Sequence, residues 1–212
     1  MDIENSPQKA ILKDVAAYYS SKLAQHGTAP KGVDWNSKES QEVRFEQLCK
    51  VIDFSEPFTV NDLGCGYGAL VDYLRGLNWS FSYAGYDVSE SMIGAAQTRF
   101  PESEATHFEV AAEPSRHADY GVASGIFNVR LDHSDEEWLS FILSTLDILN
   151  RTSTRGFSFN CLTSYSDKDK MRADLYYANS LDLFDLCKKK YSKNVSLLHD
   201  YDLYEFTILV RK

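Results

Sequence analysis

The sequence contains no uninterrupted apolar stretch of the roughly 20 residues that a membrane-spanning helix needs. Its first ten residues, MDIENSPQKA, are polar and acidic, unlike the basic and then apolar start of a secretory signal peptide. The cysteines are few and widely spaced, at Cys49, Cys65, Cys161 and Cys187, and no pair has the spacing of metal ligands. We therefore expect a cytoplasmic protein with reduced thiols, no disulfide framework and no metal site.

Positive charge is also scarce. The 212 residues carry 22 Lys and Arg against 31 Asp and Glu, a net charge of −9, and the one basic run is Lys188 to Lys190. An acidic protein repels phosphate backbones, so we expect a small-molecule substrate, no nucleic-acid partner and no membrane partner. The oligomeric state stays open. With 43% hydrophobic and 13% aromatic residues, the chain predicts one folded domain spanning residues 1–212.

The hydrophobic pattern changes character near residue 57. Before it, two amphipathic helices are predicted over residues 6–27 and 38–54, which together form an N-terminal helical cap (1–56). After it, short apolar runs alternate with helical segments, and the clearest helix covers 135–149 with Ser134 and Glu137 as a capping box. The expected strands are 58–63, 80–87, 106–110, 120–127, 155–162, 195–199 and 204–210.

This alternation predicts an α/β fold with a doubly wound, mostly parallel seven-stranded sheet over residues 57–212. Only a tight turn, DYDL, separates the last two strands, so these must run antiparallel as a C-terminal hairpin. The long segment 162–178 between the fifth strand and the next helix has the length of a lid or binding loop.

The segment VNDLGCGYGAL carries the strongest chemical signal. Gly64, Gly66 and Gly68 lie between a strand and a helix, where glycine lets backbone N–H groups approach a ligand. With Ala69, the loop also fits the GxGxxA variant of the dinucleotide-binding fingerprint. Asp62 argues against that alternative, because a carboxylate there can pair with an amino group and a pyrophosphate site has no use for it.

The motif DLGCGYG resembles the glycine-rich motif of class I S-adenosylmethionine (SAM)-dependent methyltransferases, and GYDVSESMIGAA resembles their second motif. The similarity covers roughly residues 58–210 in element order and implies a Rossmann-like fold with SAM as cofactor. It implies that Asp62 holds the SAM amino group and that Asp87 binds the ribose hydroxyls. The resemblance also implies contacts of Gly64, Cys65 and Gly66 with the methionine part. At the adenine it implies Val88, Met92 and Ala112, with Ala111 as the alternative to Ala112. Ser124 is implied near the methyl group.

The N-terminal cap offers three further candidates. Arg44 is expected to reach the SAM carboxylate, and Tyr19 and Trp35 are expected to close over the cofactor. The alternative is that Arg44 is a surface cation and that both aromatic residues belong to the core.

Methyl transfer depends mainly on aligning a nucleophile with the methyl group, and a base is needed only if the acceptor loses a proton during attack. The candidate catalytic residues are Asn128 after the fourth strand, Tyr176 in the segment 162–178 and His199 after the sixth strand. Tyr176 is expected to line an acceptor pocket. The structural alternatives are a turn cap for Asn128 and a strand-end side chain for His199. The absence of an Asn/Asp-Pro-Pro-Tyr/Phe segment favours a small-molecule or glycan-intermediate acceptor.

Two other functions remain open at this point. An enzyme of the same fold can consume SAM and release methylthioadenosine, as in azetidine-carboxylate-type cyclases or aminocarboxypropyl transfer, because a cofactor motif does not say which carbon reacts. The second of these hypotheses is a SAM-binding subunit without catalytic activity. The intact set of Asp62, Gly64, Gly66 and Asp87 argues against that one.

Overall fold

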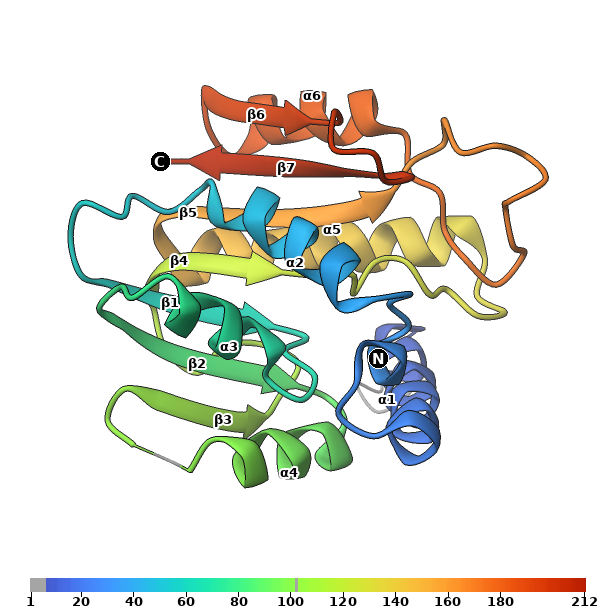
Figure 1. Cartoon of the computed structure of the whole chain (residues 1–212). Helices are drawn as coiled ribbons and strands as arrows, with labels where there is room; N and C mark the ends of the chain where they lie inside the picture. Colours follow the sequence, from blue (N-terminus) through green and yellow to red (C-terminus); the bar gives the residue numbers. More distant parts are fainter. Residues whose placement is uncertain (1–6, 102) are drawn as a thin grey trace, which may run out of the picture.

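A seven-stranded sheet forms the centre of the protein in the computed structural model, which describes residues 7–101 and 103–212 (Figure 1). The order of the strands across the sheet is β3-β2-β1-β4-β5-β7-β6. The strands β1 to β5 are parallel, and β7 runs antiparallel to both of its neighbours. This confirms the Rossmann-like sheet and the reversed C-terminal strand. The strands are β1 (Phe58–Leu63), β2 (Phe81–Asp87), β3 (Thr106–Val110), β4 (Ala118–Ala123), β5 (Ser153–Leu162), β6 (Asn194–Leu198) and β7 (Glu205–Arg211).

Helices cover both faces of the sheet, and each face has its own apolar core cluster. One cluster packs α5 and α6 against the sheet, with Trp138 and Phe159 fully buried, and the other packs α2, α3 and α4 against the opposite face. The helices are α1 (Pro7–His26), α2 (Lys38–Cys49), α3 (Ala69–Gly76), α4 (Glu90–Arg99), α5 (Asp135–Thr152) and α6 (Ser180–Lys190), with a 3₁₀ turn η2 (Pro30–Val33). Residue 6, the first of the expected N-terminal helix, lies outside the described residues.

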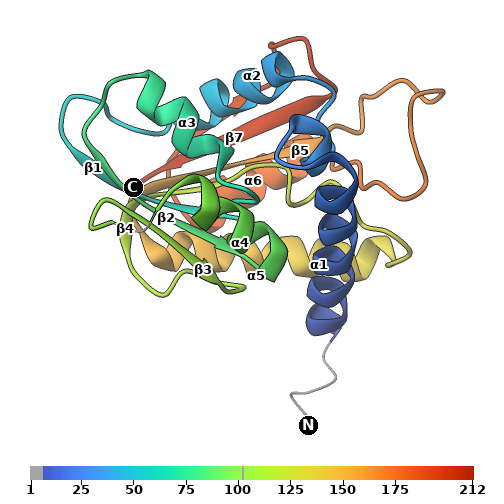
Figure 2. The same cartoon turned by 60° about the horizontal axis from the view of Figure 1, so that its bottom comes forward.

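The N-terminal cap lies at the end of the sheet to which the parallel strands point. The helix α1 packs against α4 and α5 and crosses the carboxyl ends of β2 and β3 (Figures 1 and 2). The segment between β5 and α6 projects beyond the same end of the sheet. Open α/β sheets bind their ligands at this end, so the cap and this segment surround the expected site.

Two element ends differ from the prediction by four or five residues, and the other boundaries differ by three residues or fewer. The fourth strand was expected over 120–127 but ends at Ala123, because Gly125 adopts a left-handed conformation with φ of +75°. The second helix was expected to reach residue 54 but ends at Cys49, after which the amides of Lys50, Val51 and Ile52 bond to carbonyls three residues back. The capping box at Ser134 and Glu137 is present as predicted. Within the described ranges, no helix combines the length and the apolar character needed to cross a bilayer.

Candidate active site

The loop between β1 and α3 holds three glycines in left-handed backbone conformations. The angle φ is +76° at Gly64, +53° at Gly66 and +80° at Gly68, a region that other residues rarely adopt. A β-carbon at Gly64 would lie 2.1 Å from Cγ2 of Ile126. The amide of Gly64 donates a 2.7 Å hydrogen bond to the carbonyl of Tyr86, which anchors the loop on β2. The loop therefore requires glycine at Gly64 for its conformation and for its close packing.

Two carboxylates lie at the ends of adjacent strands beside this loop. Asp62 on β1 is 3% exposed, and its Oδ2 accepts a 2.7 Å hydrogen bond from the hydroxyl of Tyr83. Asp87 on β2 accepts hydrogen bonds of 2.9 Å from the amides of Gly66 and Ser89. Burial raises the pKa of Asp62 to about 7, and it also raises the pKa of Asp87 against the lowering effect of the two amides. Two such carboxylates favour a ligand that brings positive charge or hydrogen-bond donors.

A cleft opens above the glycine loop, and its wall is formed by the ends of the central strands and by the N-terminal cap. The structure brings together at its wall all the expected cofactor contacts except Arg44. These are Tyr19, Trp35, Asp62, Gly64, Cys65, Gly66, Asp87, Val88, Met92, Ala112 and Ser124. Among the described residues, no lysine, arginine or histidine lines the cleft. In the part of the chain that the structure describes, Asp62 and Asp87 are the acidic residues of the wall.

The turn before α2 is held over the cleft by two side chains of α1. Asp34 is paired with Lys22 of α1 at 2.7 Å and accepts a hydrogen bond from the hydroxyl of Tyr18. These contacts place the neighbouring residues Tyr19 and Trp35 in the cleft wall. Burial raises the pKa of Tyr19 strongly, so its phenol is neutral.

Arg44 is placed differently from the expectation. Its guanidinium is paired with Glu205 of β7, and the two side chains are 9% and 1% exposed. It also donates to the carbonyl of Ser40 at 2.6 Å and lies 3.9 Å below the ring of Trp35. Arg44 therefore does not line the cleft, because its guanidinium is paired with Glu205. It contacts Trp35, which does line the cleft.

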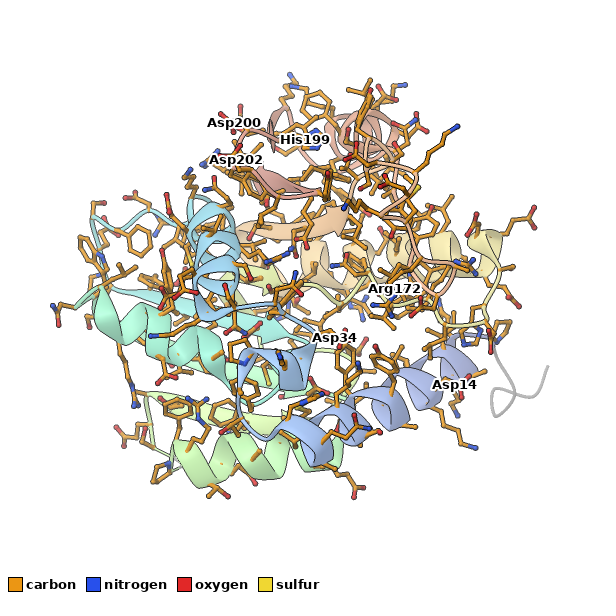
Figure 3. The ribbon with its side chains drawn as sticks, turned by 45° about the vertical axis from the view of Figure 1, so that its right-hand side comes forward. Asp14, Asp34, Arg172, His199, Asp200 and Asp202 are labelled. Atoms are coloured by element: carbon orange, nitrogen blue, oxygen red, sulfur yellow. The ribbon has the colours of Figure 1, made fainter. Side chains whose placement is uncertain are left out.

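The three candidate catalytic residues do not line the cleft. Asn128 is buried, and its Oδ1 accepts a hydrogen bond from the amide of Leu162 at 3.1 Å. Tyr176 donates its amide to the carbonyl of Asn128 at 2.8 Å, and its half-buried ring packs on the apolar core. His199 is exposed between the rings of Tyr165 and Phe206, and Figure 3 shows it with Asp200 and Asp202, well away from Asp34. The structure therefore gives Asn128 and Tyr176 a role in connecting β4 to the segment before α6.

Sequence reasoning missed several cleft residues. Gln41 and Phe45 line the cleft from α2, and Tyr67 lines it from the glycine loop itself. Gln41 is 6% exposed and lies one helical turn before Arg44, so the helical periodicity around Arg44 is the signal that points to it. Ile126, Phe141 and Thr145 complete the apolar wall from the β4–α5 side.

No protein-family model matches the chain. The chain is 60% identical over 163 residues to "Putative methyltransferase Rv1506c" of Mycobacterium tuberculosis, an alignment that covers 77% of this chain and 98% of that protein. A solved complex of DhpI with SAM and HEP is similar over 95% of this chain and 98% of that chain, with a TM-score of 0.65 and 14% identity. Human N-acetylserotonin methyltransferase in complex with SAM matches over 95% of this chain and 66% of that chain, with a TM-score of 0.56 and 16% identity.

The structural likenesses show a shared fold, and the close relative shows the family. The sheet order, the left-handed glycine loop and the two strand-end carboxylates agree with the two sequence motifs that resemble those of SAM-dependent methyltransferases. The chain belongs to the class I SAM-dependent methyltransferases, whose cofactor is SAM.

The cleft fits that cofactor on its own geometry. The hydroxyl oxygen of Ser124 is buried at the cleft wall and has no hydrogen-bond partner among the described residues. A buried polar atom of this kind is costly unless a ligand or water completes it. Together with the two carboxylates, it leaves polar contacts for a cationic, hydroxyl-bearing ligand.

Proposed function

We propose that the protein transfers the methyl group of SAM to a small molecule, with glycan intermediates among the candidate acceptors. The observation that carries this proposal is the cleft itself, in which buried Asp62 and half-buried Asp87 lie at one side and the cap residues Tyr19 and Trp35 cover the other. A cleft covered by cap residues admits a small acceptor more readily than a polymer.

Each lining group has a proposed role toward SAM, which supplies an electrophilic methyl group on a sulfonium when bound. Asp62 accepts hydrogen bonds from the α-ammonium group, and Asp87 accepts them from the ribose hydroxyls. The apolar side chains of Val88 and Met92, with Ala112, form the adenine site. Gly64, Cys65 and Gly66 supply the floor beneath the methionine part.

The charges around the cleft also bear on the acceptor. The wall carries two acids and, among the described residues, no cation, so it favours uncharged or cationic acceptors over phosphate-bearing ones. No histidine stands in the described wall to remove a proton. Alignment of the acceptor with the methyl group is therefore the main contribution of the protein, an effect worth roughly 7–11 kcal/mol in well-oriented reactions. The name of the human neighbour, N-acetylserotonin methyltransferase, agrees with a small acceptor.

The test is product analysis. Purified protein is incubated with SAM alone and with SAM plus a pooled metabolite extract, and the adenosyl products are identified by mass spectrometry. We expect S-adenosylhomocysteine (SAH) to rise only with extract and only with Asp62 intact. Methylthioadenosine formed from SAM alone, above the background of the Asp62→Ala variant, would contradict methyl transfer and indicate cleavage at the γ-carbon of the methionine side chain.

A further inference from the structure

We propose that Glu205 is a positioning residue that shapes the cleft at the carboxyl end of β4. Glu205 pairs with Arg44, which packs on Trp35. Glu205 also accepts a hydrogen bond from Asn160, which in turn binds the amide of Gly125. The inference rests on the proposed function, because it assigns a role in arranging the same cleft. It adds residues of β5, β7 and α2 that do not line the cleft themselves.

The ion pair between Arg44 and Glu205 is bidentate and buried. Nε of Arg44 donates to the two carboxylate oxygens at 3.0 and 2.9 Å, and Nη2 donates to Oε1 at 2.6 Å. Burying two charges carries a large desolvation cost, and replacing such a pair with apolar residues is often neutral or stabilising. Stability alone therefore does not account for a charged pair at this place in the fold.

One branch of the contacts leads to Trp35. Cζ of the Arg44 guanidinium lies over the indole ring, 3.9 Å from its centre, which is within the range of a cation–π interaction. The far edge of the same ring lies against Gly125, since a β-carbon there would be 2.3 Å from Cζ2 of Trp35. Trp35 is thus clamped between a fixed cation and the segment that follows β4.

The second branch leads to the backbone of that segment. Nδ2 of Asn160 donates to Oε2 of Glu205 at 2.5 Å, and Oδ1 of Asn160 accepts from the amide of Gly125 at 2.7 Å. Gly125 has φ of +75° and directly follows Ser124, whose hydroxyl is buried and unpartnered at the cleft wall. The Glu205 carboxylate therefore fixes the position of the Trp35 indole and also the position of the backbone that carries Ser124.

The test separates positioning from stability with an apolar replacement of the pair. The double variant Arg44→Met with Glu205→Leu is compared with wild type by thermal unfolding and by calorimetric titration with SAH. We expect an unfolding temperature near that of wild type and SAH binding weaker by about 3- to 30-fold, the range that corresponds to one lost cation–π contact. Arg155→Met is the matched control, because Arg155 also pairs with a carboxylate (Asp53, 3.3 Å) and stacks on Tyr120 (5.3 Å), at the opposite end of β5. It should leave SAH affinity unchanged.

A double-mutant cycle identifies the route of the effect. The Arg44→Met and Glu205→Leu substitutions are also made together in a Trp35→Ala background. There they should weaken SAH binding by a factor at least threefold smaller than the factor they cause with Trp35 present. Equal factors in the two backgrounds would overturn the proposal. Arg44→Lys keeps the charge but loses the planar stacking surface, and it should also weaken SAH binding even if the double variant does not fold. Wild-type SAH affinity in a folded double variant or in Arg44→Lys overturns this inference alone, whereas failure of the wild type to bind SAH overturns the proposed function with it.

Discussion

The two halves of the sheet build their sides of the cleft in different ways. On the β1–β2 side, Asp62 and the glycine loop are contiguous in sequence, and Asp87 ends the next strand. On the β4–β7 side, the geometry depends on Asn160 and Glu205 together with Arg44, which is 161 residues away from Glu205. The first side depends on local backbone conformation and buried carboxylates, and the second depends on long-range polar contacts. The difference implies that substitutions on the first side affect ligand binding directly, while those on the second act through other residues.

The largest effect should come from the glycine loop. Gly64→Ala introduces a β-carbon 2.1 Å from Ile126 at a φ of +76°, a strained conformation that costs about 1–3 kcal/mol before the clash is counted. We expect SAH binding to be lost in calorimetry. Gly94→Ala is the control, since that glycine lies inside α4 with no atom near its added β-carbon. It should raise stability by about 0.5–1 kcal/mol. Wild-type SAH affinity in Gly64→Ala would show that the loop does not contact the cofactor.

The two carboxylates should have the next largest effect. Asp62→Ala and Asp87→Ala each remove a charged hydrogen-bond acceptor, typically worth about 1.5–3 kcal/mol, which corresponds to roughly a 10- to 150-fold loss of SAH affinity. Asp185→Ala on the exposed face of α6 is a control for the loss of one negative charge. If neither cleft variant weakens SAH binding more than Asp185→Ala does, the assignment of Asp62 and Asp87 to the cofactor site is wrong.

The same contrast explains what the sequence revealed. Asp62, Gly64 and Asp87 belong to strand–turn–helix units, in which a short segment determines its own geometry, so their convergence was predictable. The partner of Arg44 was not, because nothing local to α2 indicates that Glu205 will face it across the fold. His199 was expected near the site because its strand ends at the correct edge, yet β6 is the outermost strand of the sheet and carries it away from the cleft. Neighbouring strand ends predict proximity only when the strand order is known.

A smaller, graded effect is expected from pH. In the free protein Asp62 is protonated below its pKa of about 7, and the ammonium group of SAH pairs with the ionised form. SAH affinity should therefore rise up to about tenfold per unit as pH increases toward 7 and then level off, with release of one proton on binding at lower pH. Because folding raises this pKa, the free protein loses stability as pH rises through the same window. Asp62→Asn should flatten both profiles, and a profile that persists in Asp62→Asn would assign the titration to another group.

On the β4–β7 side, the loss of one buried hydrogen bond should lower stability and leave binding almost unchanged. Asn128→Ala leaves the amide of Leu162 without its 3.1 Å partner. The expected cost is about 1–3 kcal/mol in the free energy of unfolding, measured by urea titration. SAH affinity should stay within about twofold of wild type at a temperature where the variant is folded. A tenfold loss of affinity would mean that Asn128 belongs to the cleft after all.

The smallest effect should come from His199→Ala. The ring is exposed and contacts only Tyr165 and Phe206 among the ring contacts of the described residues, so neither stability nor SAH affinity should change by more than about 0.5 kcal/mol. The informative measurement is methyl transfer once an acceptor is known. If His199→Ala lowers kcat while SAH affinity stays at the wild-type value, the histidine reaches the acceptor in the loaded enzyme, and the connection between β6 and β7 must move to bring it there. If kcat is also unchanged, His199 takes no part in methyl transfer, and the residues that line the cleft are the ones to test for a role toward the acceptor.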